Sequence, residues 1–281
     1  MQSLVPLLFL SAVAALPQAY SNGVIENSFP VGQGSNADSP SILIVGGRDA
    51  QPGEFPWQVS LQYVTDGVMT HQCAGTIVDE THIVTASHCE YDGYQVVAGA
   101  QSVQKNETTQ QRITALRFVS HPDFNLSLVN DDVAVMTLSS PLVFNDRVKP
   151  LRLPAANANP VGQLCVTSGW GNANPTGENP PIYPDVLQAV NLTVITNEEC
   201  QERQSEAYVD ETMICAHYSN GGKSACTGDS GGPLVCSDAQ GPYLAGIASW
   251  IARPCGQAQF PTVFSRVSVN LDFIDLVRSE E

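Results

Sequence analysis

Basic residues are scarce in this sequence, and their scarcity narrows the range of expected partners. Among 281 residues, 12 lysines and arginines stand against 28 aspartates and glutamates, so the formal net charge is −16. Nucleic acids and anionic membrane surfaces attract basic patches, so we expect neither as a partner. The charge alone says nothing about a substrate.

Long apolar runs are missing beyond one short stretch near the amino terminus. Residues 4–16 are mainly apolar and precede Pro17-Gln18-Ala19. This run is too short to span a bilayer and is typical of a signal peptide, which we place at residues 1–19. Residues 20–41 are rich in Gly, Ser, Asn and Pro and have little apolar surface, which predicts a linker or a removable pro-segment. We therefore expect a secreted, extracellular protein.

No two cysteines have the CxxC spacing of a zinc site, although the chain contains eight of them. An even number of cysteines in a secreted chain indicates disulfides, whose pairing the spacing leaves open. From Ile44 onward, short β-branched runs alternate with turn residues, which predicts an all-β sandwich or barrels. The expected strands include residues 57–62, 76–78, 96–97, 133–138, 164–166, 189–194, 234–235 and 244–248. A stripe of Val269, Phe273, Leu276 and Val277 predicts one carboxyl-terminal helix.

Three short motifs contain the residue types of nucleophilic catalysis. Residues 227–234 (TGDSGGPL) place Ser230 among glycines, which let backbone N–H groups point at one spot. Residues 83–89 (IVTASHC) end an apolar run at His88, and residues 130–135 (NDDVAV) set a carboxylate before a buried strand, where it needs a partner. Asp131 and Asp132 both qualify as that carboxylate.

These motifs, in the order His, Asp, Ser, resemble the chymotrypsin–trypsin family of serine endopeptidases. The family register selects Asp132, which directly precedes Val-Ala-Val. The resemblance implies that His88 is the general base and acid, that Asp132 orients it, and that Ser230 is the nucleophile. It also implies an oxyanion hole from the Gly228 and Ser230 amides, and two six-stranded antiparallel β-barrels with a carboxyl-terminal α-helix. The peptidase domain would span residues 44–281.

Other segments are similar to the same family. They are residues 44–47 (IVGG), 56–59 (PWQV), 168–171 (SGWG) and 249–250 (SW). The resemblance implies the disulfides Cys73–Cys89, Cys165–Cys236, Cys200–Cys215 and Cys226–Cys255. It also implies protein or peptide substrates, protein inhibitors as further partners, a monomeric state and no cofactor.

Two other classes of function compete with this interpretation. A protease homologue that has lost catalysis would usually lack a triad member, and all three are present. A serine esterase or lipase on an α/β scaffold would have the order Ser, Asp, His, which the observed order and the β-rich texture oppose.

The resemblance also predicts activation by cleavage between Leu43 and Ile44, with residues 20–43 as the pro-segment. The new Ile44 ammonium would pair with Asp229, set the Gly228 amide and open the substrate pocket. Most relatives carry Arg or Lys before this Ile, so Leu43 implies an activator that cuts after Leu.

The predicted S1 pocket is shallow and apolar. Ser224 matches its floor, where trypsin-like enzymes carry Asp, and Ile251 and Thr262 match walls that are glycine in chymotrypsin-like enzymes. Both wall residues are β-branched and stiff, which resembles the elastases and predicts cleavage after small to medium aliphatic residues. The alternative is a chymotrypsin-like preference for Leu, Phe or Tyr. The substrate backbone would pair with Ser249, Trp250 and Ile251 as an added strand.

Two surface features complete the sequence-based predictions. Sequons at Asn106, Asn125 and Asn191 could each carry a glycan in a secreted chain. Some family members bind calcium in the loop matching residues 100–110, where this chain has Ala100 and Gln110 at the glutamate ligand positions. Glu107 alone is a poor calcium cage, so we predict no metal.

Overall fold

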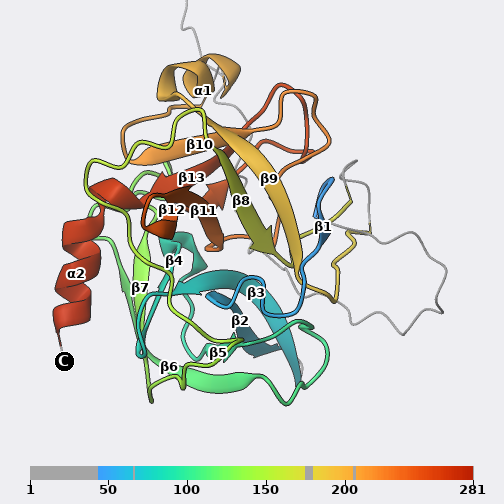
Figure 1. The fold of residues 1–281 in the computed structure, drawn as a ribbon, viewed down its shortest axis with the longest axis vertical. Coiled ribbons are helices and arrows are strands. Elements are labelled where there is room, and N and C mark those ends of the chain that lie inside the picture. The colour runs from blue at the N-terminus through green and yellow to red at the C-terminus, as the bar shows by residue number, and fades with distance from the viewer. Residues whose placement is uncertain (1–43, 66, 175–179, 205–206, 281) are drawn as a thin grey trace, which may run out of the picture.

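The computed structural model describes residues 44–65, 67–174, 180–204 and 207–280. The predicted signal peptide at residues 1–19 and the pro-segment at residues 20–43, including Leu43, lie outside the described residues. Within the described part, the chain forms two β-barrels, one above the other in Figure 1.

The first barrel contains six antiparallel strands in the closed order β2-β3-β4-β7-β6-β5. Its strands are β2 (Gln58–Thr65), β3 (Val68–Ile77), β4 (His82–Thr85), β5 (Gln95–Ala98), β6 (Gln111–Ser120) and β7 (Ala134–Leu138). β5 pairs with β2, so no edge remains open. Closure removes the unpaired backbone groups that an open sheet would expose. The interior is filled by apolar side chains, including Val59, Leu61, Ile83, Val135 and Met136, all fully buried.

The second barrel closes through the pairing of β8 with β9. Its six strands are β8 (Leu164–Gly169), β9 (Gln188–Ile195), β10 (Met213–His217), β11 (Pro233–Asp238), β12 (Gly241–Trp250) and β13 (Thr262–Arg266). The short strand β1 (Arg48–Asp49) adds to the outside of β9. The two six-stranded antiparallel barrels confirm the predicted fold class.

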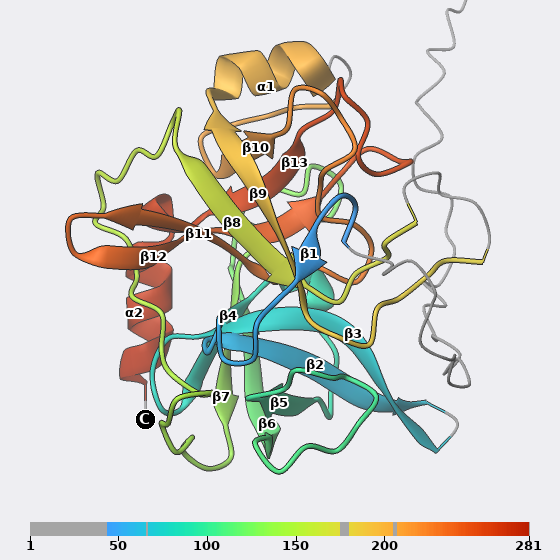
Figure 2. The same ribbon diagram turned by 45° about the vertical axis from the view of Figure 1, so that its right-hand side comes forward.

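Two α-helices occur among the described residues, α1 (Asn197–Gln204) and α2 (Leu271–Ser279). Helix α2 is the predicted carboxyl-terminal helix, and Figure 2 shows it running along the side of both barrels. The stripe predicted for its buried face was partly wrong. Val269 lies in a preceding 3-10 turn and is 51% exposed, and Leu276 is 59% exposed, whereas Ile274 and Val277 are buried. Helix α2 packs against β7 and against the 3-10 turn that precedes it, and these contacts determine which of its side chains are buried.

All eight cysteines form disulfides, in the four pairs that the resemblance implies: Cys73–Cys89, Cys165–Cys236, Cys200–Cys215 and Cys226–Cys255. Cys73–Cys89 ties β3 to the turn that carries His88, and Cys226–Cys255 ties the loop before Ser230 to the loop after β12. Among the helices of the described residues, none is long and apolar enough to cross a membrane.

Candidate active site

The three residues of the predicted triad come from the two barrels. His88 lies in the 3-10 helix η1 (Ser87–Cys89), which follows the buried strand β4, and Asp132 lies just before β7. These two strands pair with each other, from His82 opposite Thr137 to Thr85 opposite Ala134, so their ends lie side by side. Ser230 belongs to the second barrel, in the loop that leads into β11.

The Asp132 carboxylate contacts both the ring and the backbone of His88. Asp132 Oδ2 lies 2.7 Å from His88 Nδ1, and Asp132 Oδ1 accepts the His88 backbone N–H at 2.9 Å. The Ser249 hydroxyl donates a further hydrogen bond to Oδ2 at 2.6 Å, and the Ser265 hydroxyl donates to the Asp132 carbonyl at 2.9 Å. Asp132 is fully buried, and these bonds supply the partners that a buried carboxylate requires.

Electrostatics in this pair favour a charged carboxylate beside a basic imidazole. Burial would raise the pKa of Asp132, but His88 and the hydrogen bonds from His88 and Ser249 hold it below its ordinary value. Burial would lower the pKa of His88, but the Asp132 carboxylate raises it above its ordinary value. Asp131 makes no such contact, and its pKa is raised by burial and by neighbouring acids. The geometry therefore brings Asp132, not Asp131, to His88.

The loop that carries Ser230 contacts both barrels. The Ser230 carbonyl accepts the Ala74 N–H at 2.7 Å, and Gly231 donates its N–H to Ala248 at 2.8 Å. Gly231 has φ +77°, and a Cβ there would overlap Thr85 Oγ1 and the Ala74 carbonyl oxygen. Only glycine fits so close to the neighbouring barrel. This contact joins the Ser230 loop to the barrel that carries His88.

A second contact fixes the loop at Gly228, which has φ +98°. The His71 ring, on β3, lies with Nε2 2.9 Å from the Gly228 carbonyl oxygen and Nδ1 2.8 Å from the Ser60 hydroxyl. Burial lowers the pKa of His71 to about 4, despite its hydrogen bond to Gly228. At neutral pH the ring is uncharged, so Nε2–H donates to Gly228 and Nδ1 accepts from Ser60. The sequence motifs contained no signal for His71.

Asp229 is the most unusual ionisable group of the site. Its buried carboxylate accepts the backbone N–H groups of Gly171 and Cys226, each at 2.8 Å. Burial raises its pKa to about 7, although these two hydrogen bonds oppose the shift. Among the described residues, no basic side chain lies within ion-pair distance of Asp229. The buried Asp229 carboxylate therefore has no cationic side chain of the described residues to balance a negative charge.

Residues 44 and 45 are packed among the loops of the second barrel. Ile44 is fully buried and Val45 is 2% exposed, and the Val45 carbonyl accepts the Ser224 N–H at 3.2 Å. Gly46 has φ +65°, and a Cβ there would overlap the Gly222 carbonyl oxygen. The predicted mature amino terminus therefore contacts the loop that carries the predicted pocket floor.

The predicted pocket residues lie on adjoining parts of the second barrel. Ser224 and Thr262 are 2% and 3% exposed, and the hydroxyl of each has no hydrogen-bond partner among the described residues. Ile251 is half-buried and packs on the Cys226–Cys255 disulfide. Ser249 and Trp250 end β12, and both remain partly exposed.

The three sequon asparagines, Asn106, Asn125 and Asn191, are all exposed. In the loop of residues 100–110, Glu107 Oε2 accepts the backbone N–H groups of Gln101 and Ser102 at 2.7 and 3.1 Å. Gln110 Nε2 lies 3.0 Å from the Ser102 carbonyl, 2.9 Å from the Lys105 carbonyl and 3.3 Å from Glu107 Oε2. An amide NH₂ group thus lies among oxygen atoms of the kind that bind cations.

Comparison with known proteins places this geometry in a family. A family model described as Trypsin matches residues 44–274. Over 238 residues the chain is 39% identical to Trypsin-1 of Astacus astacus, which covers 82% of this chain and 98% of the relative. It is 37% identical to Kallikrein-1 of Mus musculus, over 80% of this chain and 85% of the relative. It is 36% identical to Anionic trypsin of Canis lupus familiaris, over 84% of this chain and 88% of the relative.

Proposed function

Because this chain belongs to the trypsin family and is a serine endopeptidase, we propose that it works through His88, Asp132 and Ser230 on protein or peptide substrates. The observation that carries this assignment is the buried Asp132 carboxylate, 2.7 Å from His88 Nδ1. A carboxylate so placed fixes the imidazole tautomer and leaves Nε2, which lies 3.9 Å from Cys89 Sγ, to accept a proton. A homologue without catalysis would not require this arrangement.

The proposed reaction has two halves. Ser230 Oγ attacks the scissile carbonyl carbon while His88 Nε2 takes its proton, and the carbonyl oxygen becomes an oxyanion held by the Gly228 and Ser230 amides. The C–N bond then breaks, the amine leaves with the proton from His88, and an acyl-enzyme remains on Ser230. Water repeats the sequence with His88 as base, which releases the acid and restores Ser230. No cofactor or metal enters these steps.

The substrate backbone would bind along the end of β12. The pairing of β11 with β12 ends at Pro233 opposite Ile247, while β13 pairs on the other side as far as Trp250. Among the described residues, the backbone of residues 249–251 therefore pairs with no strand on the side that faces away from β13. An extended peptide would add there as a strand, held by main-chain hydrogen bonds.

The S1 pocket is proposed to accept small to medium aliphatic side chains. Ser224 supplies no charge at the floor, and Asp229, the buried acid on the same loop, is occupied by Gly171 and Cys226. A lysine or arginine side chain would therefore be buried without a partner. The β-branched Thr262 and Ile251 narrow the space that glycines would leave open. The runner-up is a preference for Leu, Phe or Tyr.

We propose that the protein is made with a signal peptide and secreted as a monomeric zymogen, and that cleavage after Leu43 activates it. The buried Ile44 side chain, the buried Val45 and the uncompensated Asp229 carboxylate support this proposal. A new ammonium group at Ile44 would give Asp229 its missing cation. Amino-terminal sequencing of the active enzyme should start at Ile44, and a different first residue would contradict the proposal.

A fluorophosphonate probe tests the catalytic assignment. The active enzyme should be labelled on Ser230, whereas Ser230→Ala and a protein that keeps residues 1–43 should not be labelled. Thr227→Ala removes a different hydroxyl from the same loop, so it is a matched control that should keep its label. Absence of labelling in the correctly cleaved, folded enzyme would favour a homologue without catalysis.

A further inference from the structure

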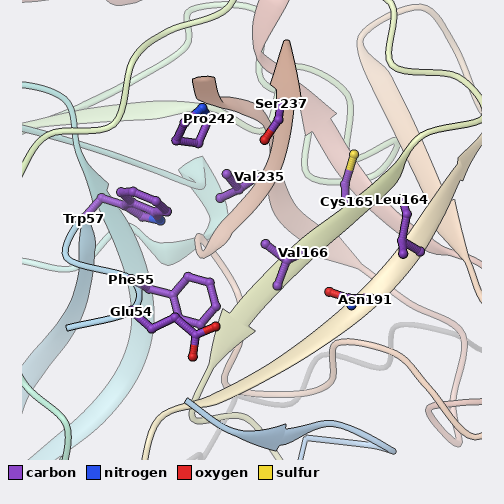
Figure 3. A pocket seen from close by; sticks show the side chains of 10 residues that line it. All are labelled: Glu54, Phe55, Trp57, Leu164, Cys165, Val166, Asn191, Val235, Ser237 and Pro242. Carbon is purple, nitrogen blue, oxygen red and sulfur yellow. The ribbon is translucent and has the colours of Figure 1, made fainter. Parts of the chain in front are cut away.

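A groove between the two barrels shares no residue with the triad or the predicted S1 pocket. Its volume is about 310 Å³, at the lower end of the range for small-molecule sites. Figure 3 shows residues of the segment that leads into β2 on one side and residues of β8, β9, β11 and β12 on the other. The apolar side chains that line it are Phe55, Trp57, Leu164, Val166, Val235 and Pro242.

The groove has a buried floor and an exposed apolar rim. Phe55 and Val235 are 8% and 5% exposed, whereas Leu164 is 67% exposed at the edge. Leu164 and the aromatic rings of the groove together form an apolar surface that is exposed to water, which is unfavourable. A group that covered Leu164 at this edge would remove its apolar surface from water.

Asn191 lines the same groove and belongs to a sequon, Asn191-Leu192-Thr193. On the paired strands β8 and β9, Asn191 is opposite Val166 and Thr193 is opposite Leu164, so all four side chains share the outer face. Leu192, between them, is fully buried on the other face. The acceptor asparagine and the exposed leucine are therefore neighbours.

The Asn191 side chain is also chemically free. It makes no hydrogen bond with any residue that the structure describes, and it is exposed. In the sequon at Asn125, by contrast, the side-chain oxygen accepts the N–H groups of Ser127 and Leu128 at 2.9 and 3.3 Å. The Asn191 amide can thus carry a substituent without giving up a contact.

We propose that an N-linked glycan on Asn191 places its first sugar, N-acetylglucosamine, in this groove. The inference rests on the proposed secretion of the chain. Transfer from a lipid-linked oligosaccharide diphosphate forms the bond from sugar C1 to Asn191 Nδ2, breaks the C1–O bond to the diphosphate and releases one amide proton. The acetyl methyl and the C–H face of the ring then pack on Leu164 and Val166.

The polar rim of the groove suits the hydroxyl groups of the sugar. Ser237 presents an exposed hydroxyl, and Glu54 is a half-buried carboxylate already bound by Arg48 and by the Gln51 N–H at 2.8 Å. Because Phe55 and Trp57 lead into the first barrel and Leu164 begins the second, the sugar would bridge both barrels. A glycan in this position should stabilise the folded enzyme.

The test compares thermal unfolding of the mature enzyme secreted from a eukaryotic host that adds high-mannose glycans. Glycopeptide mass spectrometry should find Asn191 occupied. Trimming with endoglycosidase H to a single N-acetylglucosamine should leave Tm unchanged, whereas Asn191→Gln should lower Tm by about 2–4 °C. Leu164→Ser should lower Tm by a similar amount in the glycosylated enzyme and by much less in the Asn191→Gln background.

Asn106→Gln, a sequon outside the groove, is the matched control, and its effect should add to that of Leu164→Ser. Additive effects of Asn191→Gln and Leu164→Ser, or an unoccupied Asn191, would overturn the proposal. If Asn191→Gln is not secreted, labelling with ¹³C N-acetylglucosamine decides, because nuclear Overhauser effects should join the acetyl methyl to Leu164. Their absence would also overturn it. Peptidase activity of Asn191→Gln on a small substrate should be normal. Failure of the glycan proposal would therefore leave the catalytic proposal intact.

Discussion

His71 Nε2 lies 2.9 Å from the carbonyl oxygen of Gly228, across 157 residues of sequence. This bond joins a strand of the first barrel to the loop that positions the proposed oxyanion hole. Gln62 donates to Ser60 at 3.1 Å, and Ser60 donates to His71, so a buried chain of hydrogen bonds ends at Gly228. We therefore expect His71 to position the loop that carries Gly228 and Ser230.

Removing this contact should slow catalysis more than it weakens substrate binding. In His71→Leu the Gly228 carbonyl loses its donor, so kcat should fall by about tenfold, the equivalent of one hydrogen bond, with KM little changed. Steady-state kinetics on a small peptide substrate measures this. Ser60→Ala should cause a smaller loss in the same direction, and an unchanged kcat in His71→Leu would refute the positioning role.

The same histidine should make the fold sensitive to acid. Its folded pKa of about 4 lies below the ordinary value of 6.5, so the neutral ring contributes stability above pH 6.5 that is lost as the pH falls toward 4. The full loss amounts to roughly 3 kcal/mol. Urea unfolding of wild type and His71→Gln across this window should show a steeper decline in the wild type. Parallel declines would contradict the assignment.

Asp132 should set the acid limb of the pH–rate profile. Only neutral His88 can accept the Ser230 proton, so kcat/KM should rise with pH through a His88 pKa that lies above its ordinary value. Asp132→Asn removes the charge that raises this pKa, so the limb should move to lower pH. The loss known for this family's triads on that change is about 10⁴-fold. If the acid limb of kcat/KM lies at the same pH in Asp132→Asn as in the wild type, Asp132 does not raise the pKa of His88 and the prediction is contradicted.

Short apolar strands are local signals, so the sequence pattern predicted an all-β fold, and the resemblance to the family predicted the two barrels that the structure has. The expected strands did not include β6, β10 and β13; the residues of β6 are mostly half-exposed and alternate poorly, whereas β10 and β13 are short, almost wholly buried strands without alternation. Helix α1 was missed because it is polar nearly all round, with Cys200 and Gln204 as its buried residues. Its place depends on the Cys200–Cys215 disulfide and on contacts with β10.

The supporting residues of the site were beyond the sequence motifs for a different reason. His71 and Ser265 reach Gly228 and Asp132 only after distant strands have packed together. The Ser249 side chain was assigned to substrate binding alone, yet it also donates to Asp132. Such contacts depend on tertiary placement, which no spacing rule encodes.

The loop of residues 100–110 should be independent of metal. Gln110 Nε2 donates toward the carbonyls of Ser102 and Lys105, where a cation would otherwise be attracted to oxygen ligands. Excess EDTA should therefore leave Tm unchanged, and Gln110→Ala should destabilise the fold by about 0.5–1.5 kcal/mol through the lost hydrogen bonds. Gln104→Ala is a control in the same loop. A drop in Tm with EDTA that calcium restores would contradict this prediction.

Activation should change how stability depends on pH. In the uncleaved chain the folded pKa of Asp229 is about 7, above its ordinary value of 3.8, so stability is lost as the pH rises from about 4 to 7. In the cleaved enzyme an Ile44 ammonium would keep the carboxylate charged and remove this loss. The Tm difference between the two forms should widen between pH 5 and pH 7. A constant difference would argue against the ion pair.

Substrate preference tests the central claim most directly. We would measure kcat/KM on peptides that differ only in having Ala, Val, Leu, Phe or Arg before the scissile bond, for the mature enzyme and for the Ile251→Gly, Thr262→Gly double variant. The account predicts that Ala, Val or Leu is preferred in the wild type, and that the double variant gains on Phe. A tenfold preference of the wild type for Phe over Ala and Val, about 1.4 kcal/mol, would contradict the elastase-like pocket, and a preference for Arg would contradict the whole assignment of the pocket.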